Sequence, residues 1–208
     1  MDLQALIPVF VTLFVVIDPI GLMPLFVALT KGATTAERRS IAIRATTIAA
    51  VLLTLFGLMG EAVLGFLGIS MSAFRIAGGV LLFLTAIDML FERRSQRRKD
   101  QSETGIDPAD DPSVFPLSTP LIAGPGSIAA IILLSGEADG WAGVVAVHGA
   151  MLAVIAMVLV FFLSAGVLER LLRKTGINVL TRLLGMLLAA LAVQFVLDGM
   201  KDFGFLAG

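Results

Sequence analysis

The chain has 208 residues, of which 58% are hydrophobic and only 15% are charged, and its mean hydropathy is +0.99. So much apolar surface cannot be buried in one soluble core, and lipid must be the solvent for most of the chain. The net charge of −1 gives no basic footprint for nucleic acid, and the absence of cysteine excludes disulfide bonds.

Six nearly uncharged stretches are candidate spans, because a transmembrane helix needs about 20 apolar residues. In chain order they are Leu3–Thr30, Ala45–Phe74, Ile76–Phe91, Val114–Gly136, Trp141–Leu168 and Leu183–Leu197, with Gly68-Ile69-Ser70 as the turn between the second and the third. Met1-Asp2 supplies no basic region, so we expect the first stretch to be retained rather than cleaved as a signal peptide. The sequence predicts an all-α membrane protein with six transmembrane helices.

The distribution of basic residues predicts the orientation. The loops after spans one, three and five hold 13 of the 15 basic residues: Lys31, Arg38, Arg39, Arg44, Arg93, Arg94, Arg97, Arg98, Lys99, Arg170, Arg173, Lys174 and Arg182. Only Arg75 and Lys201 fall elsewhere. Because cytoplasmic loops are enriched in Lys and Arg, we expect these three loops in the cytoplasm and both termini outside.

Two proline motifs interrupt the apolar sequence, and a helix cannot run undisturbed through either. The first is Asp18-Pro19-Ile20-Gly21-Leu22-Met23-Pro24, and the second is Thr119-Pro120-Leu121-Ile122-Ala123-Gly124-Pro125-Gly126-Ser127. Broken backbone at membrane depth survives only where protein or a water-filled cavity satisfies its polar groups. Each motif therefore indicates a candidate site, in span one and in span four.

Asp18 is the only charged residue of the 28-residue stretch Leu3–Thr30. An intramembrane carboxylate costs about 2.5–3.5 kcal/mol unless it faces a cavity or a partner. Beside carbonyl groups freed by Pro19, Asp18 can attract a substrate ammonium, Na⁺ or a proton. A purely local alternative is that Asp18 caps the half-helix that begins at Pro19, and the two roles can coexist.

The second motif has the opposite charge preference. A helix that begins at Pro125 presents N–H groups and about half a positive charge, which suit a carboxylate. The glycines of both motifs permit close approach of a ligand or, alternatively, close helix packing. Together the motifs predict a site for a zwitterion, formed by Asp18, Pro19, Gly21 and Pro24 with Thr119, Pro120, Gly124, Pro125, Gly126 and Ser127.

Four further polar residues have two interpretations each. Arg75 and Arg182 open the third span of each half, either as gating ion pairs or as snorkelling anchors. Gln194 predicts an interhelical hydrogen bond or a contact with substrate. His148 predicts an interhelical hydrogen bond, whereas a Ser127–His148 hydrolase dyad would require the two side chains to meet. The sequence contains no metalloprotease, P-loop or dinucleotide motif, so we expect neither an enzyme nor a metal or cofactor.

The order of features repeats on either side of residues 92–113, a polar, proline-containing segment that we interpret as a cytoplasmic linker. Each half has a broken span, a second span, a turn (68–70 or 176–178) and an Arg-x-x-Gly sequence opening a third span. Three spans per copy is an odd number, so the second copy must be inverted in the membrane. We expect one membrane domain over residues 1–208, with repeats at about 1–91 and 114–208.

The quoted motifs, together with Ala192-Val193-Gln194-Phe195 and Asp198-Gly199, resemble those of the MarC family of bacterial inner-membrane proteins. The resemblance implies a grouping with the LysE-type exporters and six spans in two three-helix repeats. It also implies transport of small neutral amino acids, and we expect a secondary transporter that works by alternating access on an H⁺ or Na⁺ gradient. The alternatives are a non-transporting membrane scaffold and, more remotely, an intramembrane hydrolase. The expected partners are the bilayer and a small zwitterionic substrate, and a homo-oligomer is compatible with the sequence.

Overall fold

The computed structural model describes residues 3–91 and 111–204, with only the backbone described at residues 3, 5 and 167–174, and every regular element in these ranges is a helix. The elements are α1 (Leu3–Ile17), α2 (Pro19–Leu29), α3 (Thr35–Phe66), α4 (Met71–Leu90), η1 (Ser113–Ile122), α6 (Pro125–Gly136) and α7 (Gly140–Asp202). Five helices are long and apolar enough to cross a membrane, and there are six spans if the bent pair η1 and α6 counts as one. The all-α class is confirmed for the described residues, and residues 92–110 of the predicted linker lie outside them.

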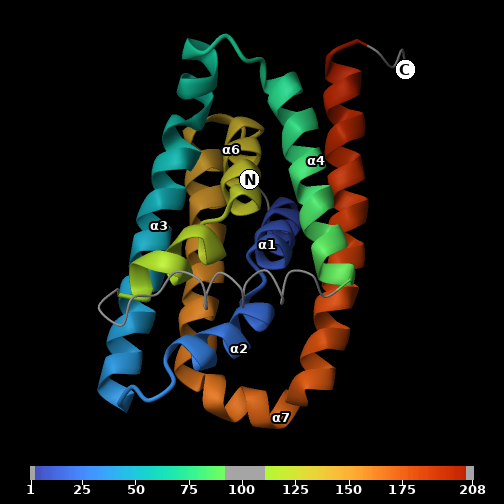
Figure 1. Cartoon of the computed structure of the whole chain (residues 1–208). Coiled ribbons are helices and arrows are strands. Elements are labelled where there is room, and N and C mark those ends of the chain that lie inside the picture. The colour runs from blue at the N-terminus through green and yellow to red at the C-terminus, as the bar shows by residue number, and fades with distance from the viewer. Residues whose placement is uncertain (1–2, 92–110, 205–208) are drawn as a thin grey trace.

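Helices α3 and α4 run in opposite directions and are joined by a short turn (Figure 1). A capping box starts α3: the Thr34 hydroxyl accepts from the Glu37 N–H, and the Glu37 carboxylate accepts from the Thr34 N–H. The 32 residues of α3 extend about 48 Å, which exceeds the roughly 30 Å of hydrocarbon, so its basic first turns project beyond the membrane. The predicted turn before α4 is present: Gly68 has a φ of 72°, and Ser70 caps α4.

Helix α7 contains two spans, Gly140–Gly166 and Thr175–Asp202, that run in opposite directions (Figure 1). We call them its first and second arms. The predicted turn at Gly176-Ile177-Asn178 is wrong, because these residues are helical and the reversal lies just before them. Glycine inside a helix costs only about 1 kcal/mol, and burial of the Ile177 side chain offsets that cost.

Helices α1, α2 and α6 lie between the long helices in the view of Figure 1, whereas η1 crosses α3. Helix α1 ends at Ile17 and α2 begins at Pro19, whereas η1 and α6 meet at an angle of 55°. Helices α1 and α2 both contact α7, and α1 also contacts α6. The ring of Phe26 on α2 stacks on that of Phe162 on the first arm of α7, with centroids 4.4 Å apart. Most of α2 and α6 is buried, whereas Val114 and Phe115 at the start of η1 are exposed.

The two ends of the bundle differ in the elements that they carry. One end, which we call the linker face, carries the α2–α3 loop and the reversal of α7 (Figure 1). The other end, which we call the Arg75 face, carries the α3–α4 turn, the α6–α7 connection and the last turn of α7 (Figure 1). Apolar side chains that point outward along α3 and α4, such as Val51, Leu55 and Leu84, are about half exposed, as expected for contact with lipid.

Candidate functional site

Helices α1 and α2 meet at Asp18, whose side chain is fully buried. Its backbone is in the left-handed region, with φ of 56° and ψ of 63°, a conformation that Asp tolerates better than most residues. Pro19 has no N–H and starts α2 at the position where proline is favoured. The Asp18 Oδ1 atom accepts a hydrogen bond of 3.0 Å from the Gly21 N–H. Asp18 is therefore the cap of α2, as the local interpretation expects.

Gly21 provides the space for the Asp18 carboxylate. A Cβ atom at position 21 would lie 2.1 Å from Asp18 Oδ2 and 2.8 Å from Asp18 Cγ, far inside van der Waals contact. No side chain therefore fits at this position unless the carboxylate moves. The glycine is required by the aspartate three residues before it, and helix packing does not account for it.

The second proline motif lies where η1 ends and α6 begins, at a bend of 55°. Phe115 and Thr119 inside η1 have extended backbone, which accounts for its irregular course before Pro116 and Pro120. Gly124 is also extended and approaches the Pro120 carbonyl so closely that a Cβ would lie 2.5 Å from its oxygen. The bend therefore requires a glycine at this position.

Helix α6 starts at Pro125 without any side-chain cap. Ser127 lies in its first turn and is only 3% exposed. The N–H groups of a first turn have no partner inside their own helix, so this start is suited to bind an anion. Pro24, Pro120 and Gly126 are partly buried, whereas Thr119 and Pro125 are exposed.

The two breaks are joined by a contact at Gly126. A Cβ at this position would lie 3.5 Å from side-chain atoms of Val16 on α1 and of Leu82 and Thr85 on α4. Val16 is two residues before Asp18, so the start of α6 is adjacent to the turn of chain that carries the carboxylate. The structure thus brings the segment that leads to Asp18 next to the start of α6, although the two motifs are about 100 residues apart in sequence.

Ser118 is a polar residue of this region that the sequence analysis did not select. Its side chain is fully buried, and its hydroxyl has no hydrogen-bond partner among the described residues. Buried hydroxyls are almost always hydrogen-bonded, so the Ser118 hydroxyl, which has no partner in the described part of the chain, is available to bond a ligand. Its position beside Thr119-Pro120 in an apolar stretch is a signal that could have identified it.

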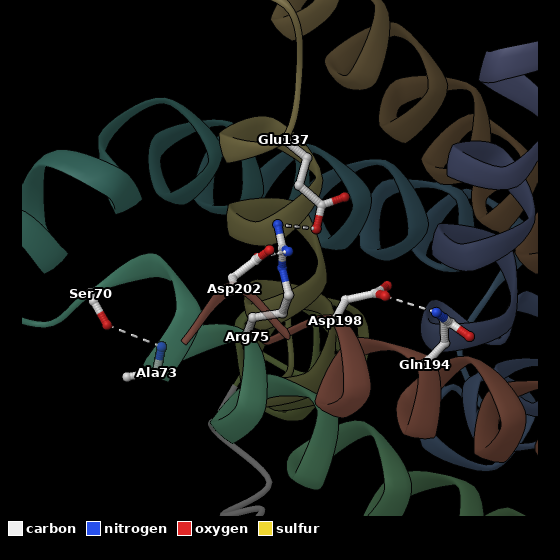
Figure 2. Close-up of polar contacts among 7 residues, drawn as sticks. All are labelled: Ser70, Ala73, Arg75, Glu137, Gln194, Asp198 and Asp202. Carbon is white, nitrogen blue, oxygen red and sulfur yellow. Dashed lines mark hydrogen bonds and ion pairs between the residues drawn. The ribbon is translucent and has the colours of Figure 1, made fainter. Parts of the chain in front are cut away.

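Arg75 lies near the start of α4 and links this helix to the ends of α6 and α7 (Figure 2). Its guanidinium pairs with Glu137, at the end of α6, with an N–O distance of 2.9 Å, and with Asp202, at the end of α7. The Arg75 side chain is only 14% exposed, and that of Glu137 is 36% exposed. Burial raises the pKa of Glu137; Arg75 opposes this shift, and the charges of Asp198 and Asp202 add to it.

Gln194 lies on the second arm of α7. It donates a hydrogen bond of 2.8 Å to Asp198, one turn later on the same helix (Figure 2). The expected interhelical hydrogen bond is therefore wrong, because the amide reaches a nearer acceptor on its own helix. Arg182 is exposed and lies near the beginning of the second arm of α7, away from the Arg75 face.

His148 bonds within its own helix, because its Nδ1 lies 2.8 Å from the Val144 carbonyl. Since a carbonyl can only accept, Nδ1 carries the hydrogen. The Nε2 atom is buried against Gly57 of α3, where a Cβ would lie 2.7 Å from it. The expected interhelical hydrogen bond is therefore wrong for His148 as well. Among the described residues, no group of three or more His, Cys, Asp or Glu side chains could hold a metal ion.

Comparison with known proteins extends over almost the whole chain. The profile of the MarC family integral membrane protein matches residues 3–203. A UPF0056 membrane protein of Methanocaldococcus jannaschii is 38% identical over 97% of this chain and 98% of its own length. YvbG, a UPF0056 membrane protein of Bacillus subtilis, is 38% identical over 94% of both chains.

A third relative is the UPF0056 inner membrane protein YhgN of Escherichia coli K12, 34% identical over 92% of this chain and 93% of its own. No solved structure matches the chain significantly. The family profile spans the two proline motifs and the Arg75 cluster, which consists of Arg75, Glu137, Asp198 and Asp202. The chain therefore belongs to the MarC family of integral membrane proteins.

Proposed function

We propose that this protein is a secondary transporter of small neutral amino acids, or of similar small zwitterions, across the inner membrane of a bacterium. The observation that carries the proposal is the contact of the two breaks through Val16 and Gly126. Val16 lies two residues before the buried Asp18, and Gly126 lies in the first turn of a helix that lacks a side-chain cap, which supports a shared site. A molecule with one positive and one negative end complements both groups at once.

Asp18 binds the ammonium end of the substrate. Its Oδ1 already accepts from the Gly21 N–H, and a carboxylate can accept about four hydrogen bonds in all. In a buried site of low dielectric constant, attraction between unit charges is several-fold stronger than in water. Capping and cation binding are compatible, because the cap fixes the carboxylate in place for its second task.

The start of α6 binds the carboxylate end. The N–H groups of Gly126 and Ser127 lie in the first helical turn, and the Ser127 hydroxyl adds a donor. Residues next to the breaks are apolar and buried, including Ile17, Ile20 and Ala123. Such surroundings favour a substrate with a small uncharged side chain, since a second charge there would be unpaired.

Alternating access follows from two inverted three-helix repeats, with spans one to three in the first and four to six in the second. The similar placing of one broken span in each half supports this arrangement. The linker face is cytoplasmic, in agreement with the basic residues of its loops, and the Arg75 face with both termini is external. Coupling uses an H⁺ or Na⁺ gradient.

Counterflow in proteoliposomes tests the proposal. Vesicles preloaded with unlabelled glycine, L-alanine or L-serine should accumulate the same labelled amino acid, whereas L-lysine and L-glutamate should give no exchange. Ser127→Ala should weaken apparent affinity only a few-fold, because the backbone N–H groups remain. If no small amino acid exchanges, the transporter proposal fails and a non-transporting scaffold becomes the better account.

A further inference from the structure

Helix α4 and the second arm of α7 are held together by backbone contacts along their length. A Cβ at Gly79 of α4 would lie 2.8 Å from the Ala192 carbonyl oxygen, and one at Gly199 would lie 3.0 Å from that of Ser72. Small residues that let two backbones approach in this way favour stable association of helices in membranes. Arg75 and its partner Asp202 therefore belong to one rigid pair of helices.

Helix α6 is held less closely against that pair. Where α6 approaches α4 at Gly78, the nearest atom to an added Cβ is a methyl group of Leu133, which is the flexible end of a side chain. The helix has only 12 residues, about 18 Å, with Ser127 in its first turn and Glu137 directly after its last. Any movement of the candidate site at the start of α6 is therefore transmitted to Glu137.

We propose that the Arg75–Glu137 ion pair is a releasable latch that closes the Arg75 face over the candidate site, with Asp202 as the fixed partner of Arg75. This inference rests on the proposed function, since a latch is meaningful only above a site that opens. In the structure the latch is closed, and Asp18 and Ser127 below it are buried.

The chemistry of Arg75 suits this role. One terminal nitrogen of its guanidinium contacts Glu137 and the other contacts Asp202, so the two ends of one planar group join separate helices. When α6 moves, Arg75 loses only one of its two carboxylates. Its charge remains paired, which avoids the penalty of leaving a largely buried charge alone. A lysine has a single ammonium and cannot hold two carboxylates in this fork geometry.

The chain contains no cysteine, so accessibility can be measured with a single introduced thiol. Ser127→Cys is the reporter, and a membrane-impermeant maleimide is added to sealed vesicles of each orientation. Leu67→Cys, an exposed position in the α3–α4 turn, identifies the vesicles whose Arg75 face is outward. Thr85→Cys, whose native hydroxyl is near Gly126, is a second reporter if the first lowers protein yield.

Glu137→Gln should raise the labelling rate of Ser127→Cys several-fold from the Arg75 face and leave it unchanged from the linker face. Asp202→Asn should have a much smaller effect, because it leaves the Arg75–Glu137 pair in place. Glu61→Gln is the matched control, since Glu61 is an exposed carboxylate near the end of α3 at the Arg75 face and outside the Arg75 cluster. It should change nothing.

Equal labelling in wild type and Glu137→Gln would overturn the latch, and so would an Asp202→Asn variant that opens as far as Glu137→Gln. A slower labelling rate of Ser127→Cys in the presence of glycine or L-alanine, called protection, is measured separately. Labelling that rises in Glu137→Gln without such protection would keep the latch and refute the proposed substrate. Protection without any effect of Glu137→Gln would keep the substrate and refute the latch.

Discussion

Replacement of Gly21 by alanine should destabilise the protein through a collision with Asp18. The added Cβ would lie 2.1 Å from Asp18 Oδ2, so the carboxylate must leave its position. Loss of the cap costs about 0.5–2 kcal/mol, and overfilling a packed interior costs about 1–3 kcal/mol. The better helix propensity of alanine returns at most about 1 kcal/mol. We therefore expect a net loss of about 0.5–4 kcal/mol in the free energy of unfolding.

Gly126→Ala is the matched control for this substitution. Its Cβ would meet its nearest neighbours at 3.5 Å, an ordinary contact distance. Its stability should therefore stay within about 1 kcal/mol of wild type. Unfolding by SDS at constant total detergent, followed by circular dichroism, gives the comparison.

A second substitution tests the cause of the loss. Asp18→Gly removes the carboxylate and suits the left-handed backbone at position 18. In this background Gly21→Ala should cost little, so the two substitutions should couple by about 1 kcal/mol or more. Strictly additive effects would refute the reasoning, as would a Gly21→Ala protein as stable as Gly126→Ala.

Three other predictions concern the surrounding structure. Burial raises the pKa of Glu137, so the folded protein binds this proton more tightly than the unfolded chain does. The stability that results from this proton is complete below the ordinary pKa of 4.5 and is lost as the pH rises through the raised pKa. The thermal midpoint of the wild type should therefore fall across this range relative to Glu137→Gln, and parallel profiles would contradict the argument. Gly57→Ala should lower the midpoint by several degrees because its Cβ would lie 2.7 Å from His148 Nε2, and His148→Ala should restore part of the loss. Arg44→Gln should cost less than about 1 kcal/mol and lose even that in high salt, because the 2.7 Å pair of Arg44 with Asp111 is exposed.

Much of the helical framework follows from hydropathy alone. The turn at Gly68-Ile69-Ser70 was predictable because Gly68 needs a positive φ and Ser70 is a good helix cap. Helix α3, however, begins ten residues before the predicted span at Ala45. Hydropathy detects only the part in lipid, whereas the Thr34–Glu37 capping box marks the true start.

The candidate site was only partly predictable. The proline motifs lie where α1 gives way to α2 and where η1 gives way to α6, but the prediction is wrong at Pro24, through which α2 continues. Which side chains meet across the bundle depends on packing between distant residues: Arg75 and Asp202 are 127 positions apart. The acceptors of Gln194 and His148 on their own helix were likewise not predicted, since the same side chains could reach a neighbouring helix equally well. The role of Gly21, which leaves space for the Asp18 carboxylate, becomes clear only from the three-dimensional structure.

Binding of labelled L-alanine to wild-type protein and to Asp18→Asn tests the ionic role of Asp18 most directly. Asparagine keeps the size of the side chain and its ability to cap α2, but removes the charge. The account predicts that Asp18→Asn is as stable as wild type within about 1 kcal/mol, yet loses at least tenfold in affinity because the ammonium has no counter-charge. A stable Asp18→Asn protein that binds L-alanine as tightly as wild type would contradict it.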